Sequence, residues 1–176
     1  MALTKIRTGG ITADAVDNTI LKLDDDFALT GTVSGAGKIL QVVTTNSTDG
    51  NTGNITTLTA AGTVAITPSA TSSKIFVIAH GAGQVTCGSN GIMETQILRG
   101  GTDGTKLGVF YSGMSTTTNG QVHYFTPHNS VTDSPSSTSE ITYTWAVTKG
   151  SGGTTNARIF ASASFPLTMT AMEIGG

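Results

Sequence analysis

The stretch EITYTWAVT, residues 140–148, indicates the fold of this chain more clearly than any other. Its hydrophobic and polar side chains alternate along the sequence, with Ile141, Tyr143, Trp145 and Val147 on one side and Glu140, Thr142, Thr144 and Thr148 on the other. A period of two residues predicts a β-strand with one buried face and one hydroxyl-covered face. We therefore expect Tyr143 and Trp145 to pack in a core rather than to stack on a sugar.

On both sides of this stretch, the composition favours strands and turns over helices. The chain of 176 residues holds 33 threonines, 16 serines and 23 glycines, but only three glutamates. It is 37% hydrophobic and 11% charged, with a net charge of -2. Threonine favours strands, whereas glycine and serine favour turns. We expect an all-β domain with a hydroxyl-rich surface, and the charge excludes a basic nucleic-acid-binding protein.

Short apolar runs separated by turn residues continue from residue 38 onward. The run KIFVIA, residues 74–79, is apolar on both faces and predicts a central core strand. The pairs Asp49-Gly50, Asn90-Gly91, Asp103-Gly104 and Asn119-Gly120 are typical of hairpin turns. The last three predict a meander of consecutive hairpins, and the whole pattern predicts an antiparallel sandwich or barrel over residues 37–176.

The final strand, LTMTAMEI at residues 167–174, carries apolar residues on both faces. Leu167 and Met169 face one way, and Met172 and Ile174 face the other. A strand of this kind favours a contact between subunits, and we expect an oligomer interface at Leu167, Met169, Met172 and Ile174. Packing in the subunit's own core explains each of these residues equally well.

The N-terminal 36 residues differ from the rest of the chain. Charged residues crowd the first 26 positions, and GTVSGAG, residues 31–37, consists of small residues that favour a hinge. We interpret residues 1–36 as an anchoring arm and hinge, extended or partly helical. So short a segment cannot bury its own apolar side chains, and we expect these to pack on a partner: Val16, Ile20, Leu21, Leu23, Phe27 and Leu29.

Motifs of catalysis and nucleotide binding are not found in the sequence. The Gly37-Lys38 pair lacks the first glycine and the final hydroxyl residue of a phosphate-binding loop. Ser34 lacks the first glycine of a nucleophile elbow, and Gly81-Ala82-Gly83 lacks the third glycine of a dinucleotide fingerprint. Paired carboxylates for acid–base hydrolysis are missing as well. We expect no catalytic residues, no cofactor and no enzyme activity.

The histidines and the single cysteine offer two further candidate sites. His80, His123 and His128 could form a metal site, above all if a threefold axis brought three copies of His123 together. Co-ligands are scarce, however, and His123 alternates with apolar residues as a partly exposed strand residue does. Cys87 has no histidine and carboxylate beside it and is interpreted as a buried or hairpin-tip thiol. We expect no metal site. The sequence also lacks an apolar stretch of signal-peptide or bilayer-spanning length, so we expect synthesis in the cytoplasm and no membrane partner.

Four segments of the chain resemble small virion proteins and fibre-tip domains of tailed bacteriophages. They are the arm MALTKIRTGGITADAVDNTILKL, the run PSATSSKIFVIAHG from Pro68, the segment DSPSSTSEITYTWAV from Asp133, and the ending LTMTAMEIG. The resemblance implies a jelly-roll-like antiparallel β-sandwich, similar to tumour-necrosis-factor-like heads, that commonly forms homotrimers. It implies no catalytic residues.

The resemblance implies two functions that differ in what the arm does. In a capsid decoration (cement) subunit, the arm attaches to the major capsid protein, and trimeric contacts stabilise the shell. In a tail fibre or tail-tip protein, the arm joins the tail and the sandwich loops contact a host receptor. A soluble carbohydrate-binding module is a third alternative, which requires exposed aromatic residues at loop tips. We expect the first of these, a homotrimer located in the virion and without a nucleic-acid partner.

Overall fold

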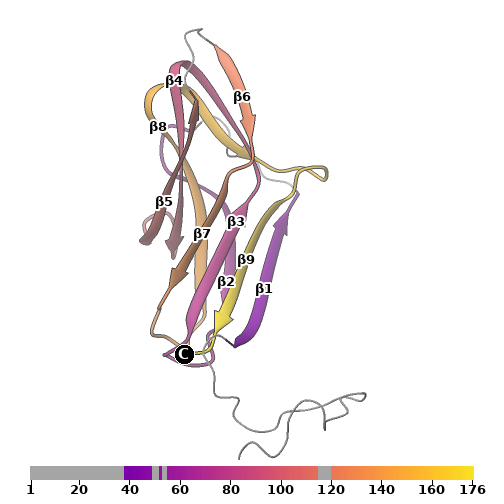
Figure 1. Cartoon of the computed structure of the whole chain (residues 1–176), viewed down its shortest axis with the longest axis vertical. Coiled ribbons are helices and arrows are strands. Elements are labelled where there is room, and N and C mark those ends of the chain that lie inside the picture. The colour runs from indigo at the N-terminus through magenta and orange to yellow at the C-terminus, as the bar shows by residue number, and fades with distance from the viewer. Residues whose placement is uncertain (1–37, 49–51, 53–54, 115–119) are drawn as a thin grey trace, which may run out of the picture. The chain divides into compact units, whose positions relative to one another are not determined.

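The computed structural model describes residues 38–48, 52, 55–114 and 120–176 of the chain. These residues form strands and turns without a helix (Figure 1). The strands are β1 (Ile39–Ser47), β2 (Thr59–Ile66), β3 (Lys74–His80), β4 (Ala82–Arg99), β5 (Thr105–Met114), β6 (Gln121–Phe125), β7 (His128–Asp133), β8 (Ile141–Phe160) and β9 (Leu167–Ile174).

The strands form two antiparallel sheets that pack as a sandwich. Sheet A has the order β1-β9-β3-β7, and sheet B has the order β2-β8-β4-β5, with β6 also paired to β4. When β6 is set aside, eight strands wind through two four-stranded sheets in the order of a jelly roll. The all-β antiparallel sandwich predicted from the sequence is confirmed.

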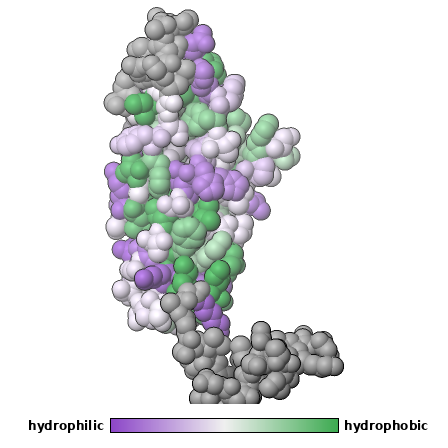
Figure 2. Space-filling view, in the orientation of Figure 1, coloured by the Kyte–Doolittle hydropathy of each residue, from purple (hydrophilic) through white to green (hydrophobic). Residues whose placement is uncertain are grey.

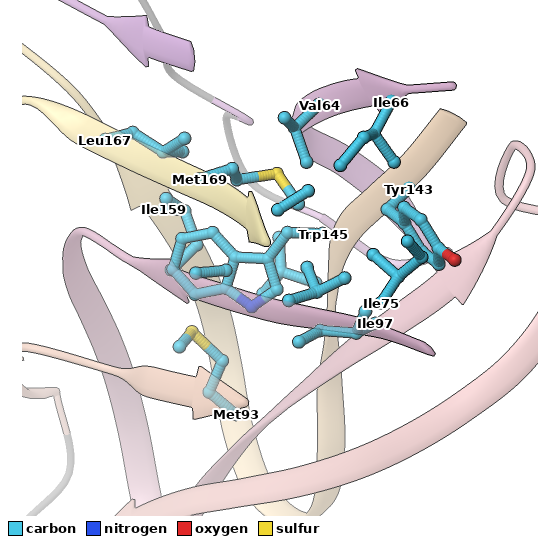
Figure 3. Close-up of a cluster of buried hydrophobic side chains, with 14 of the residues drawn as sticks. Val64, Ile66, Ile75, Met93, Ile97, Tyr143, Trp145, Ile159, Leu167 and Met169 are labelled. Atoms are coloured by element: carbon cyan, nitrogen blue, oxygen red, sulfur yellow. The ribbon is translucent and has the colours of Figure 1, made fainter. Parts of the chain in front are cut away.

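The core lies between the two sheets around Trp145. Tyr143, Trp145 and Val147 are fully buried, as the alternation at residues 140–148 predicts. In Figure 3 the indole of Trp145 lies at the centre of the cluster, with Met93 and Met169 near it. Thr144 corrects the prediction for the opposite face, because it is only 2% exposed and its hydroxyl donates a hydrogen bond of 2.5 Å to the carbonyl oxygen of Gly100.

Strand β3 occupies the central position expected for the run KIFVIA. It lies between β9 and β7 in sheet A and pairs with both. Ile75, Val77 and Ala79 are fully buried in the core, whereas Phe76 and Ile78 point to the outer side of the sheet and are half-buried. The two apolar faces of this strand therefore have different surroundings, and one of them is partly open.

The long strands β4 and β8 stay paired and bend sharply at the end of the sandwich where β6 lies (Figure 1). The first half of β4 packs on its second half, because Met93 lies against Gly83 and Val85 lies against Gly91. The chain bends near Asn90-Gly91, but β4 continues through this pair from Ala82 to Arg99 as a single strand, so the pair is not the tip of a hairpin. The expected hairpin is wrong in its pairing, since residues 83–87 pair with β6 and with the second half of β8 instead.

The two later turn predictions have different outcomes. Asp103-Gly104 lies in the turn that joins β4 to β5, and these strands pair antiparallel as expected. Gly120 lies in a turn directly before β6 and has a φ of 76°, which glycine adopts without steric cost. However, β5 and β6 pair successively along one edge of β4 rather than with each other, so the continuous meander is wrong. Asp49-Gly50 lies outside the described residues.

Candidate functional surfaces

Glu173, in β9, is a buried structural carboxylate. Its Oε1 accepts hydrogen bonds from the Ser69 backbone nitrogen at 2.7 Å and from the Ser69 and Ser73 hydroxyls at 2.6 Å each. Its Oε2 accepts a hydrogen bond of 2.7 Å from Gln41 Nε2. Burial opposes ionisation, but these hydrogen bonds outweigh it and hold the pKa of Glu173 at about 2. The carboxylate thereby joins β1, β9 and the turn before β3.

Asp133, in the DSP segment, has a comparable structural role. Its carboxylate accepts a hydrogen bond of 2.8 Å from the Tyr143 hydroxyl and forms an ion pair of 3.2 Å with Arg99. Burial, together with the hydrogen bond to Asp133, raises the pKa of Tyr143 well above its usual range. Asp133 and Glu173 therefore both stabilise the sandwich through the donors that surround them.

A third buried cluster satisfies the indole nitrogen at the centre of the core. Asn129 Oδ1 accepts hydrogen bonds from Trp145 Nε1 at 2.6 Å and from the Thr95 hydroxyl at 2.8 Å. Asn129 is only 3% exposed, so these bonds form away from water. A buried donor without a partner is costly, and Asn129 removes that cost for both side chains.

The remaining titratable residues do not form a metal cluster. Among the described residues, no group of three or more His, Cys, Asp or Glu side chains could hold a metal ion. His80 and His128 stack with ring centroids 6.0 Å apart, and Cys87 is buried, as one of its two interpretations had it. The described part of the chain also contains no helix that is long and apolar enough to cross a membrane.

Most of the exposed large hydrophobic residues gather in two places. The first is the outer face of sheet A, which we define by the outward side chains of β1, β9 and β3. On the edge strand β1, Ile39, Leu40 and Val42 are 55%, 42% and 55% exposed. Figure 2 shows hydrophobic surface over these strands in the lower half of the sandwich. Such an edge is normally protected by charge or cover.

Strand register extends this surface across sheet A. Val42 pairs with Met172 in β9, which in turn pairs with Phe76 in β3, so these outward side chains form one row. Met172, Phe76 and the neighbouring Ile174 are each half-buried. Lys74 is the one charged residue among the described outward positions of β3 and β9. The face is therefore free of carboxylates over these strands, apolar around this row and polar further along, where Thr44 and Thr170 share a hydrogen bond.

The second place is a groove beside the start of β4 and the end of β8. Its volume is about 380 Å³, and its lining residues are Ala82, Gly83, Tyr124, Phe125, Thr126, Phe160 and Phe165. Tyr124 and Phe165 are 68% and 58% exposed. The Phe160 ring lies edge-on to both, with centroid distances of 6.2 Å to Tyr124 and 6.5 Å to Phe165.

Separate elements position the aromatic walls of this groove. Phe165 belongs to the turn between β8 and β9, which backbone hydrogen bonds of 3.0 and 3.1 Å between Ser162 and Phe165 close. This turn projects from the sandwich in Figure 1 and carries hydrophobic surface in Figure 2. Tyr124 comes from β6, and Phe160 ends β8. Small Ala82, which pairs with Phe160, leaves the floor open.

A cation lies against Phe160, one of the residues that line the aromatic groove. The Arg158 guanidinium lies 5.7 Å from the centroid of the Phe160 ring, and its Nε donates a hydrogen bond of 2.5 Å to Gln84 Oε1. The single ion pair among the described residues joins Arg99 and Asp133, so Arg158 has no carboxylate partner within that part of the chain. Its positive charge is therefore available to a ligand.

The residues predicted from the sequence fall in different surroundings. Met172 and Ile174 lie on the outer face of sheet A, where another subunit could reach them. Leu167 and Met169 are 2% and 0% exposed within the core cluster, so the expected interface is corrected at these two positions. The predicted arm anchors lie outside the described residues: Val16, Ile20, Leu21, Leu23, Phe27 and Leu29.

Sequence reasoning missed the aromatic groove. A carbohydrate-binding module requires exposed aromatic residues at loop tips, but Ser, Thr, Gly and Asn dominate the turn segments of this sequence. One signal was present, since Phe165 stands alone in the serine-rich turn ASASFP, residues 161–166. His123 was expected to be partly exposed and is half-buried, but its apolar neighbour Tyr124 is the more exposed residue.

This chain is similar to known proteins in structure but not in sequence. No family model and no curated protein matches the chain. Among solved structures, a chain of the T13 viral particle of IBDV covers 88% of this chain at 14% identity, with a TM-score of 0.38. VP2 in a subviral particle of infectious bursal disease virus covers 85% at 12% identity, also with a TM-score of 0.38.

The present chain spans less than half the length of these viral chains, 41% of the first and 43% of the second. Because both TM-scores lie below 0.5, this likeness carries no conclusion about what the chain does.

Proposed function

We propose that this chain is a structural subunit of a virus particle, a capsid decoration protein that attaches through residues 1–36 and self-associates through the outer face of sheet A. The observation that carries the proposal is the exposed apolar edge formed by Ile39, Leu40 and Val42, next to half-buried Met172 and Phe76. The jelly-roll strand order, which is common in capsid and lectin domains, and the four segments that resemble phage virion proteins support it.

Physical chemistry favours a second copy of the chain as the partner of this face. An edge strand presents unpaired backbone groups, and exposed apolar residues on it promote pairing with another chain. The described outward residues of β1, β9 and β3 include one charged side chain, Lys74, so little charge has to be buried in a contact between copies. Each large apolar side chain that becomes fully buried contributes roughly 1.5–3 kcal/mol before ordering costs. Trimerisation would bury this row three times.

A lysine on the edge strand tests self-association. Val42→Lys should shift the protein from oligomer to monomer in sedimentation velocity, because it places a charge in the apolar contact. Thr142→Lys is the matched control, since Thr142 is exposed on sheet B. Circular dichroism would check that both variants fold. Unchanged association of Val42→Lys, or equal loss in both variants, would contradict the proposed interface.

The arm and the location in the particle need separate measurements. Deletion of residues 1–30 should leave a folded oligomer that no longer binds its particle, whereas normal binding would rule out anchoring by the arm. Quantitative mass spectrometry of purified virions should give a copy number close to that of the major shell protein. A few copies per particle would instead favour the second candidate, a tail-tip protein that contacts a receptor, which the aromatic groove favours.

A further inference from the structure

We propose that the groove between Tyr124, Phe160 and Phe165 binds a pyranose ring that bears a carboxylate, as in an acidic surface polysaccharide. The inference is independent of the proposed function, because a sugar site can be present whether or not the chain is a virion subunit. It rests on the shape of the groove, the exposed aromatic rings and the nearby Arg158, which has no carboxylate partner among the described residues.

The groove has the size and chemistry of a small-ligand site. Its volume of about 380 Å³ falls in the range of roughly 300–1,000 Å³ that such sites occupy. Tyr124 and Phe165 remain more than half exposed although both are aromatic. Exposed aromatic rings with polar groups nearby suit a sugar. The C–H face of the sugar is apolar and can stack on a ring, whereas its hydroxyls need hydrogen-bond partners.

Charge complementarity selects an acidic sugar over a neutral one. Arg158 stacks over Phe160, which lines the groove, and Gln84 orients it through the Nε bond. That bond leaves the terminal amino groups of the guanidinium, which match the two oxygens of a carboxylate. The groove lining contains no acidic residue to repel such a ligand. A ring stacked on Tyr124 or Phe165 could thus direct its carboxylate toward Arg158.

Calorimetry on the full chain with paired sugars tests the ligand class. The acidic probes are trigalacturonic acid and 3′-sialyllactose, and their neutral counterparts are the methyl-esterified trisaccharide and lactose. At least one acidic probe should bind about tenfold more tightly than its counterpart, because a hydrogen bond to an ionised group is the stronger kind. Binding of trigalacturonic acid would identify a site for uronic acids, and binding of 3′-sialyllactose would identify a site for sialic acids. Binding of neither, or equal binding of acidic and neutral sugars, would overturn the proposal.

Matched variants localise the binding. Tyr124→Ala and Phe165→Ala should each weaken binding about tenfold through loss of a stacking surface. Tyr111→Ala, which removes a tyrosine equally exposed at 68% on β5, should leave binding unchanged. Arg158→Gln should abolish the preference for the acidic sugar.

Near-ultraviolet circular dichroism would confirm that each variant folds. A preference that survives Arg158→Gln, or a loss in Tyr111→Ala as large as in Tyr124→Ala, would contradict the site. Loss of self-association in Phe165→Ala without sugar binding would instead assign the groove to a contact between copies.

Discussion

At the scale of single residues, Glu173 gives the sandwich a pH-dependent contribution to stability. Its folded-state pKa of about 2 lies below the ordinary value of 4.5. The contribution is therefore fully present above about pH 4.5 and is lost as the pH falls toward about 2. A shift of this size corresponds to about 3 kcal/mol, and its source is the set of donors from Ser69, Ser73 and Gln41.

Replacing this carboxylate should destabilise the fold at neutral pH. In Glu173→Gln the amide offers one acceptor oxygen where the carboxylate offers two, and we expect a loss of about 2–4 kcal/mol. Urea denaturation at about pH 7 and pH 3 measures it, and the difference between variant and parent should shrink at the lower pH. Glu140→Gln, at an exposed position, is the control. An equal loss at both pH values would refute the ionised role of Glu173.

Two methionines of β9 provide a matched pair at the same scale. Met169→Ala should reduce the free energy of unfolding by about 2–5 kcal/mol, because it leaves a cavity in the core. Met172→Ala should cost less than half as much in the monomer and should weaken self-association instead. Chemical denaturation and sedimentation would separate the two effects. Similar unfolding free energies for both variants would contradict the assignment of faces.

At the scale of elements, the sharp bend in β4 depends on glycine at position 91. A Cβ atom there would collide with Cys87 Cβ and lie 2.8 Å from Cys87 Sγ. Gly91→Ala should therefore destabilise the protein by about 3 kcal/mol or more in thermal or urea unfolding. Gly101→Ala, where a Cβ meets nothing within 4 Å, should have little effect. A tolerated Gly91→Ala would mean that this corner adjusts freely.

Elements also show how far the sequence predicts the structure. Local periodicity correctly predicts the burial of Tyr143 and Trp145 and the central place of residues 74–79, because alternation depends only on neighbours along the chain. Partners distant in sequence are not encoded locally, so the pairing of residues 83–87 with β6 and β8 could not be predicted. The aromatic groove draws on three separate elements and was missed for the same reason.

At the scale of the whole molecule, the proposed contact between copies is apolar rather than ionic. The outer face of sheet A carries few charges among its described residues, so salt should screen little of the interaction. Raising sodium chloride to about 0.5 M should leave the sedimentation coefficient of the oligomer unchanged or increased. Dissociation in salt would show that charged groups, and not the row from Val42 to Phe76, hold the copies together.

The two ends of the described sandwich lie side by side. The Gly175 backbone nitrogen donates a hydrogen bond of 2.8 Å to the Lys38 carbonyl oxygen, and Ile39 pairs with Ile174. Chain ends that meet in this way allow a domain to be inserted into a loop of another protein or to be circularly permuted. The jelly roll could therefore be inserted at a single surface turn of another protein. Peptides fused at its two ends would lie next to each other.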